Sequence, residues 1–358
     1  MNKTDYIYKE LNKYAGSLYM DDQVSVSHPL IGSIGFVNPK QGFKLRGVSS
    51  RVWKALLNDE ERFTLAPQKF ISKSILDEMG AITSWDGIVS AQAAGKYDSV
   101  ICEKNSLTTV SSNWSIMSKV AGNPPATAYN NIPGSSGMTQ TSLGAVPLSL
   151  PASGEKKYLL NVGGSNGAGT NIVLLVDLLA ANDNILATST ASQTVNTSAL
   201  LRYTGGTGVY VILEVTTQLG GTAANVTLTY TNQAGTGSRS TGAQALSTGG
   251  VVRRLQPTAY GPVMLLNTTD RGVRSVESAI LSASMGAGVL AVLLYKPLAV
   301  VPLFTALSWI ERSSPAVAAG ITELVVGTDS QLGFLTFMLL ASQGSTGIQT
   351  YQIETISG

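Results

Sequence analysis

The chain has 358 residues, of which 44% are hydrophobic and 13% are charged, and its formal net charge is +2. A typical soluble domain carries about 25% charged residues, so this chain holds about half the usual charge and has no basic or acidic excess. That balance gives no electrostatic reason to expect nucleic acid or an acidic surface as a partner. The length is enough for about two domains with a sizeable core.

The first 119 residues hold 14 of the 24 Lys and Arg and 12 of the 22 Asp and Glu. Apolar residues at helical spacing predict three helices there, over 3–14, 49–57 and 67–80. Between the first two lies 24–48, an extended stretch interrupted by proline and glycine. Such a stretch is often ordered only against a neighbour, so we expect an arm. Region 1–119 is therefore predicted to be a helical and extended arm region.

Residues 120–154 contain no charged side chain and are dominated by Gly, Pro, Ser, Thr and Asn. Proline and glycine at this density prevent regular elements, which predicts either a linker or a loop draped over a surface. A solvated linker usually carries charge as well. The absence of charged residues favours contact with another protein surface.

From residue 155 to 358 the sequence changes to short apolar runs separated by turn residues. The runs are rich in Val, Ile, Leu, Thr and Tyr, and no helical patterns alternate with them. This predicts a mainly β protein with an antiparallel, jelly-roll-like β-sandwich, either one large or two small with a subdivision near residue 250. The twelve candidate strands are 157–162, 171–179, 184–190, 209–217, 225–230, 262–267, 273–282, 289–295, 298–304, 321–326, 332–341 and 348–356.

The longest apolar stretch, 278–295, is just long enough to suggest a membrane span. Its serines and glycines and the β-like pattern on both sides favour two buried strands joined by a glycine-rich turn at 285–288. The N-terminus has no apolar segment of the signal-peptide kind. We therefore expect no membrane partner.

Residues that could carry out catalysis are scarce. The single cysteine, Cys102, is far in sequence from the single histidine, His28, so it is expected to be an inert buried thiol. Ser165 in GGSNG matches a nucleophile motif, but the motif needs a following helix and a later histidine, so we interpret it as a hairpin turn. One histidine and one cysteine exclude a zinc cluster, and no cofactor motif is present. The sequence predicts a protein that is not an enzyme and has no catalytic, cofactor or metal residues.

Basic side chains of the β region are few, and they are too sparse for a nucleic-acid face. Salt bridges at a subunit contact are the more plausible role. The loop within 229–242, TYTNQAGTGSRSTG, has one charge, Arg239, which could anchor the loop to a partner by a bidentate contact, although a mere mobile loop is the alternative. The candidate contact residues are Arg239, Arg253, Arg254, Arg271 and Arg274.

Two segments carry a resemblance. TYTNQAGTGSRSTG (229–242) followed by DRGVRSVESAILSASMGAGVLAVLLYKPLA (270–299) resembles virion structural proteins of tailed bacteriophages. In those, a strand ending in T-N-x-x-G-x-x-x-R precedes a GVRSV strand and a strand that closes on Lys or Arg plus Pro-Leu. The resemblance covers about the middle third of the chain and implies a capsid-bound or tail-bound β protein present in many symmetric copies.

These observations predict a non-enzymatic component of the phage head, a decoration, cement or minor capsid protein that stabilises the shell through subunit contacts. Expected partners are the major capsid protein, other virion proteins and further copies of the chain, with a trimer as the guess. The expected location is the virion, assembled in the bacterial cytoplasm. The alternative is a tail or fibre protein that binds a host receptor or glycan; a sandwich hydrolase and a major shell subunit are weaker options.

Overall fold

The computed structural model describes residues 23–28, 32–37, 85–109, 111–127, 138–195, 198–257, 261–303, 306–307, 309–313, 322–327, 330–342 and 344–358. Contacts along the chain divide it into two units, Met1–Glu78 and Met79–Gly358. The three helices predicted over 3–14, 49–57 and 67–80 lie outside the described residues. The division expected from composition, with boundaries after residues 119 and 154, stays a prediction.

In the first unit, β1 (Gln23–His28) and β2 (Gly32–Val37) form an antiparallel hairpin. The pairing runs from Gln23 opposite Val37 to His28 opposite Gly32. Both strands lie in the arm region, where the sequence indicated extended backbone.

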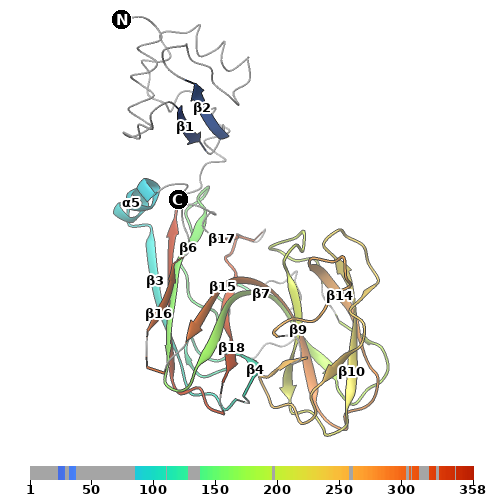
Figure 1. Ribbon diagram of the computed structural model, residues 1–358. Helices are drawn as coiled ribbons and strands as arrows, with labels where there is room; N and C mark the ends of the chain where they lie inside the picture. The colour runs from blue at the N-terminus through green and yellow to red at the C-terminus, as the bar shows by residue number, and fades with distance from the viewer. Residues whose placement is uncertain are drawn as a thin grey trace, which may run out of the picture. The chain divides into compact units, whose positions relative to one another are not determined.

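In the second unit, the described strands form three antiparallel sheets (Figure 1). The central sheet has the order β13 (Leu255–Gln256), β9 (Tyr210–Thr217), β15 (Val289–Leu303), β7 (Asn171–Leu186), β18 (Phe334–Ala341) and β4 (Asn113–Ile116). The β10 sheet has the order β11 (Arg239–Ser240), β10 (Ala224–Asn232), β14 (Val273–Leu281) and β8 (Gln193–Thr194), and β12 (Gln244–Leu246) also pairs with β10. The β6 sheet has the order β16 (Ile310–Ser313), β6 (Lys157–Asn166), β19 (Gln349–Ser357), β3 (Tyr97–Lys104) and β5 (Gly122–Asn123), and β17 (Thr322–Leu324) also pairs with β6.

The central sheet contributes to two hydrophobic cores because successive side chains of a strand point to opposite faces. In β7, Leu174 and Val176 belong to the core shared with the β10 sheet, whereas Val173 and Leu175 belong to the core shared with the β6 sheet. A strand covered on both faces is usually apolar along most of its length. This confirms the expectation that the apolar run 171–179 is covered on both sides.

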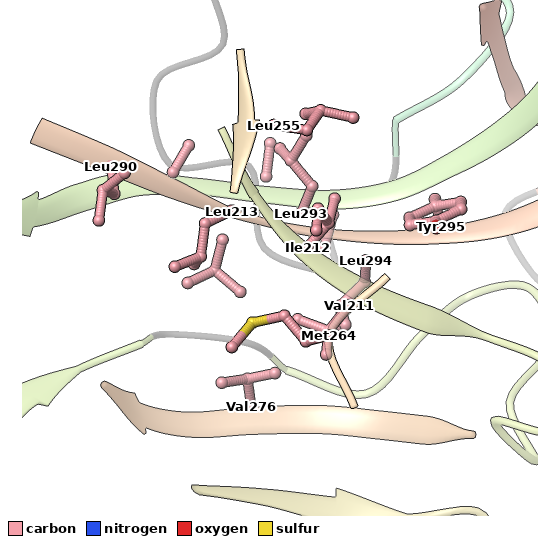
Figure 2. Packing of buried hydrophobic residues seen from close by; sticks show 14 of the residues in the cluster. Val211, Ile212, Leu213, Leu255, Met264, Val276, Leu290, Leu293, Leu294 and Tyr295 are labelled. Carbon is pink, nitrogen blue, oxygen red and sulfur yellow. The ribbon is translucent and has the colours of Figure 1, made fainter. Parts of the chain in front are cut away.

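The first core gathers side chains from β9, β15 and β14 together with the loop residue Met264 (Figure 2). In β10 every second residue, from Ala224 to Asn232, is buried against this core. The second core includes a stacked pair, Phe337 of β18 and Tyr351 of β19, whose ring centroids lie 4.0 Å apart. The predicted class, a mainly β protein built from antiparallel sandwiched sheets, is confirmed.

Several element boundaries differ from the sequence prediction. The candidate strands 171–179 and 184–190 are largely one long strand, β7, and 289–295 and 298–304 are largely one strand, β15. Proline is usually found on edge strands, and the pairing of β15 with β9 ends at Tyr295, before Pro297 and Pro302, so both prolines lie where β15 pairs only with β7 among the described strands. The run 262–267 is a loop, and its apolar pattern reflects burial of Met264, which is 1% exposed.

Elements in the region where helices were expected are partly strands. Both β3 and β4 lie before residue 119, and each pairs with a strand from the C-terminal part of the chain. The helix that the described residues contain is α5 (Trp85–Ala93). Its residues Ile88 and Ala91 pack on Tyr158 and Ile356 at one end of the β6 sheet.

The apolar stretch 278–295 divides between β14 and β15. These strands belong to different sheets, so 285–288 is a crossing between sheets rather than the turn of a hairpin. The described residues contain no helix that is long and apolar enough to cross a membrane. Ser165 lies inside β6, and after β6 the chain crosses to β7, which belongs to another sheet. The interpretation of the motif around Ser165 as a hairpin turn was therefore wrong.

The described part of the uncharged segment 120–154 packs against the sheets of the second unit, to which it belongs. Met138, Val146 and Leu148 are buried, and the amide of Val146 donates to the carbonyl of Leu335 on β18. This part of the segment therefore lies on the fold itself, along the central sheet and the β6 sheet.

Candidate assembly site

The carboxylate of Asp270 is the centre of a polar cluster at the end of the β10 sheet. It accepts hydrogen bonds from the hydroxyl of Tyr230 at 2.5 Å and from the side-chain amide of Asn232 at 2.7 Å. The guanidinium of Arg239 adds two more, Nε to Oδ2 at 3.0 Å and Nη2 to Oδ1 at 3.3 Å. The Asp270 side chain is 1% exposed, so its charge is paired out of water.

The electrostatics of this cluster favour the ionised carboxylate. Burial by itself raises the pKa of Asp270, but the hydrogen bonds from Arg239, Tyr230 and Asn232 outweigh it and hold the pKa at about 2. Burial and the bond to Asp270 raise the pKa of the Tyr230 hydroxyl to about 12. At neutral pH the cluster is therefore a carboxylate held by one guanidinium and two neutral donors.

The same cluster orders the loop that follows β10. The side-chain oxygen of Asn232 accepts from the amides of Ala234 and Thr236, which closes a tight turn with Gly235 at a positive φ of 82°. Arg274 then donates from Nε and Nη2 to the carbonyl of Gln233. The loop that follows β10 is therefore ordered by hydrogen bonds, including those from Arg274 on β14.

The structure places Arg239 in an intrachain role. The sequence led us to expect its bidentate contact to be made with a partner, but both contacts go to Asp270. Sequence reasoning missed Asp270; the signal available was a carboxylate in the D-R-G turn that opens the second segment of the resemblance. The side chain of Arg239 is 27% exposed.

The other four candidate arginines occupy different settings. Arg274 is bound to the β10 loop, and the backbone amide of Arg271 donates to the side chain of Gln233. Arg253 has a positive φ of 75° and lies within 3.5 Å of the carbonyl of Lys119, and Arg254 is 8% exposed. Arg239, Arg271 and Arg274 therefore gather at one loop, whereas Arg253 and Arg254 lie beside β13. A subunit contact at any of them stays a prediction.

Some buried charges elsewhere in the described residues are held in internal ion pairs. Arg202 binds Asp177 with two 2.9 Å contacts and donates to the carbonyl of Met138 at 2.7 Å. Glu214, fully buried on β9, lies 3.3 Å from the ammonium of Lys119. Such pairs link segments that are far apart in the chain.

Lys104 is a buried lysine held by main-chain oxygens. Its Nζ donates to the carbonyl of Val120 at 3.1 Å and to that of Pro124 at 2.5 Å. Burial lowers the pKa of Lys104 to about 8 and raises the pKa of the neighbouring Cys102 thiol to about 12. A thiol with that pKa stays protonated at neutral pH, which agrees with the expectation of an inert, buried cysteine.

The uncharged segment forms a shallow groove of about 670 Å³ at one edge of the β6 sheet. The described residues that line it are uncharged and mostly apolar, namely Asn123, Pro124, Pro125, Gln140, Thr141, Ser142, Leu143, Gly144, Ala145, Pro147, Leu148, Ser149 and Leu150. Leu143 and Leu150 are 60% and 45% exposed. The groove therefore presents apolar surface to the outside.

Three further exposed apolar side chains lie near one end of β6 in the same sheet. Leu307 is 84% exposed, and Trp309, immediately before β16, is 42% exposed. Ile348, immediately before β19, is 57% exposed. The amide of Leu307 donates to the carbonyl of Asn166, the last residue of β6. The amide of Gly167, which follows Asn166, donates to the carbonyl of Ile348. These bonds bring the two loops to the same end of β6.

The described residues contain no group of three or more His, Cys, Asp or Glu side chains that could hold a metal ion. No protein-family model matches the chain, and a search of curated proteins finds no match. Among solved structures, the chain is similar to the crystal structure of the infectious bursal disease virus VP2 subviral particle. The identity is 8% over 73% of this chain and 80% of that chain, with a TM-score of 0.15. A TM-score this low does not establish a shared fold.

Proposed function

We propose that this protein is a non-enzymatic structural component of a tailed-phage head, a decoration, cement or minor capsid protein that stabilises the shell through subunit contacts. Its partners would be the major capsid protein, other virion proteins and further copies of the chain. Its location would be the virion.

The observation that carries the proposal is the joining of the two resemblance segments in one cluster. Asn232 and Arg239 come from T-N-x-x-G-x-x-x-R, and Asp270 and Arg274 come from the D-R-G-V-R stretch about thirty residues later. The two patterns bind each other through Asp270 and through the carbonyl of Gln233. The spacing that resembles phage virion proteins therefore has a physical basis in this chain as a folding unit.

The surface chemistry supports a role in assembly. An uncharged groove and a set of strongly exposed apolar side chains lie on a rigid sandwich. Contiguous apolar surface of this kind, where it is large, marks contact sites in soluble proteins. The alternative, a tail or fibre protein that binds a glycan, favours an aromatic-lined site, and the described lining of the groove contains no aromatic residue.

The proposal is tested by purifying particles of the phage that encodes the chain and digesting them for mass spectrometry. We expect peptides of this chain to co-purify with heads separated from tails. Recovery of the chain only from the lysate, or only from the tail fraction, would contradict the head assignment. A particle assembled with a chain that lacks residues 1–48 then tests whether the arm region attaches it.

A further inference from the structure

Residues 120–124 form a short strap along the edge of the β6 sheet. The strap contains β5 (Gly122–Asn123), the two-residue strand that ends this sheet beside β3. The amide of Asn105 donates to the carbonyl of Ala121 at 2.9 Å. Residues 121–123 are exposed. The strap is therefore held to β3 by few main-chain contacts, and such short edges are the parts of a fold that open most easily.

The ammonium of Lys104 joins the two ends of the strap. Its Nζ donates to the carbonyls of Val120 and Pro124, and the residue is only 2% exposed. No carboxylate of the described residues forms an ion pair with it, and segment 120–154 contains no charged residue at all. An ammonium buried among carbonyl oxygens lacks the opposite charge that would offset its loss of water.

The groups around Lys104 supply no such charge. The titratable groups of the neighbouring elements are Cys102 and Glu103 on β3, Tyr351 on β19 and Lys119 before the strap. Cys102 is a protonated thiol at neutral pH, because its pKa is about 12. Glu103 is exposed on the opposite face of β3, since neighbouring side chains of a strand point to opposite faces. The hydroxyl of Tyr351 donates to Gln349, and Lys119 is paired with a carboxylate on β9.

We propose that the strap is a proton-linked conformational device, in which protonation of Lys104 favours an open form that has left the edge of β3. The ammonium regains water when the strap opens, so the open form binds the proton more tightly than the closed form does. Asn123 and Pro124 also line the groove, so opening removes part of its wall. The inference goes beyond the proposed function and does not rest on it.

The sign of the pH dependence follows from the burial of Lys104. Burial lowers its pKa to about 8 in the closed form, against 10.5 for an ordinary lysine. Between these values the closed form has released a proton that the open form keeps, so a rise in pH favours the closed form. Opening should therefore be easiest below pH 8 and should become harder as the pH rises toward 10.5.

The test is amide hydrogen exchange of the full-length chain by NMR from pH 7 to pH 10, with each rate corrected for the intrinsic rate at that pH. The amide of Asn105 reports opening, because its partner is the carbonyl of Ala121 in the strap. We expect its protection to be constant below pH 8 and to rise by up to about tenfold per pH unit above it. It should also stay below the protection of the amides of β19, because the strap opens without the rest of the sheet.

A matched control amide lies beside another two-residue edge strand. The amide of Thr241 donates to the carbonyl of Leu228 next to β11. That edge is held by Arg239 and Asp270, which keep their charges from pH 7 to pH 10. The protection of Thr241 should therefore not change over this range.

Variants at Lys104 identify the titrating group. Lys104→Met removes it, and Lys104→Arg keeps its charge throughout, so in both variants the protection of Asn105 should be independent of pH, whatever its level. If neither variant folds, NMR at the Cε of Lys104 in the wild type decides, and we expect its titration midpoint to match the pH at which protection begins to rise.

Several results would overturn the inference. These are a flat profile of Asn105 in the wild type, an equal rise at Thr241, a rise that persists in Lys104→Met, a protection of Asn105 equal to that of β19, or a Lys104 midpoint near 10.5. None of these measurements depends on whether the chain is found in particles, so the proposed function stands or fails separately.

Discussion

Arg239 binds Asp270 across 31 positions of sequence, with its Nε 3.0 Å from one carboxylate oxygen and its Nη2 3.3 Å from the other. Tyr230 and Asn232, at the end of β10, donate to the same carboxylate. One buried acid therefore joins the end of β10, the loop that follows it and the turn before β14.

Replacement of Asp270 by asparagine should destabilise the fold. The substitution removes the charge and turns one acceptor into a donor, which leaves buried donors unsatisfied at a cost of about 1–3 kcal/mol in the free energy of unfolding. Urea denaturation measures this change. Glu277→Gln is the control, because Glu277 is an exposed acceptor for the hydroxyls of Thr231 and Ser275, and it should change stability by less than about 0.5 kcal/mol. Equal effects of the two substitutions would show that the cluster around Asp270 is not a structural centre.

The free energy of unfolding at acid pH should depend on the ionisation of Asp270. Its pKa is about 2 in the folded chain, against an ordinary value of 3.8, so the folded state holds the ionised form more strongly. The resulting stabilisation is present above pH 4 and is lost as the pH falls from about 4 to about 2. The difference in unfolding free energy between the wild type and Asp270→Asn should therefore shrink over that window. A difference that stays constant down to pH 2 would contradict the depressed pKa.

Replacing both members of the buried ion pair Asp177–Arg202 should destabilise the fold less than replacing either one alone. Both side chains are at most 2% exposed, so Asp177→Leu or Arg202→Met alone leaves an uncompensated buried group and should cost about 3–5 kcal/mol. The double variant Asp177→Leu with Arg202→Met removes both charges and should recover much of that loss. A double-mutant cycle on unfolding free energies measures the coupling. Additive losses would mean that the pair makes no joint contribution.

The lowered pKa of Lys104 leads us to expect that the stability of the fold rises with pH in the alkaline range. Its pKa is about 8 in the folded chain and 10.5 ordinarily, so between these values the unfolded chain binds a proton that the folded chain has released. Stability contributed at this site therefore rises with pH across the window, by at most about 1.4 kcal/mol per pH unit. The difference between the wild type and Lys104→Met should grow from pH 8 to pH 10.5. The thiol of Cys102 is common to both proteins, so to a first approximation its titration cancels, and a flat difference would contradict the buried ammonium.

The sequence predicted much of the fold because half-buried strands alternate apolar, buried residues with polar, exposed ones. The alternation of 225–230 and 348–356 and the unbroken apolar run of 171–179 each correspond to strands with the expected exposure. Strand β3 was missed because its more buried face alternates charged Asp98 and Lys104 with Val100 and Cys102, and because it lies in the charge-rich N-terminal part. Its place is fixed by β19, more than two hundred residues away.

The candidate site was harder to predict because its partners are distant in sequence. The five arginines were chosen as the single charge of one loop and as two basic clusters in a charge-poor region, but local sequence does not show that Arg239 meets Asp270. The exposed Leu307 has no sequence signature either, since its distinguishing features are a backbone angle and an exposed fraction. Both depend on how distant segments pack.

The central claim, that this chain is a repeated structural part of a phage head, is tested most directly by its copy number in purified particles. Quantitative mass spectrometry against the major shell protein gives the ratio. We predict a count comparable with the number of shell lattice positions. A count of only a few copies per particle would contradict the claim and favour the tail or fibre alternative.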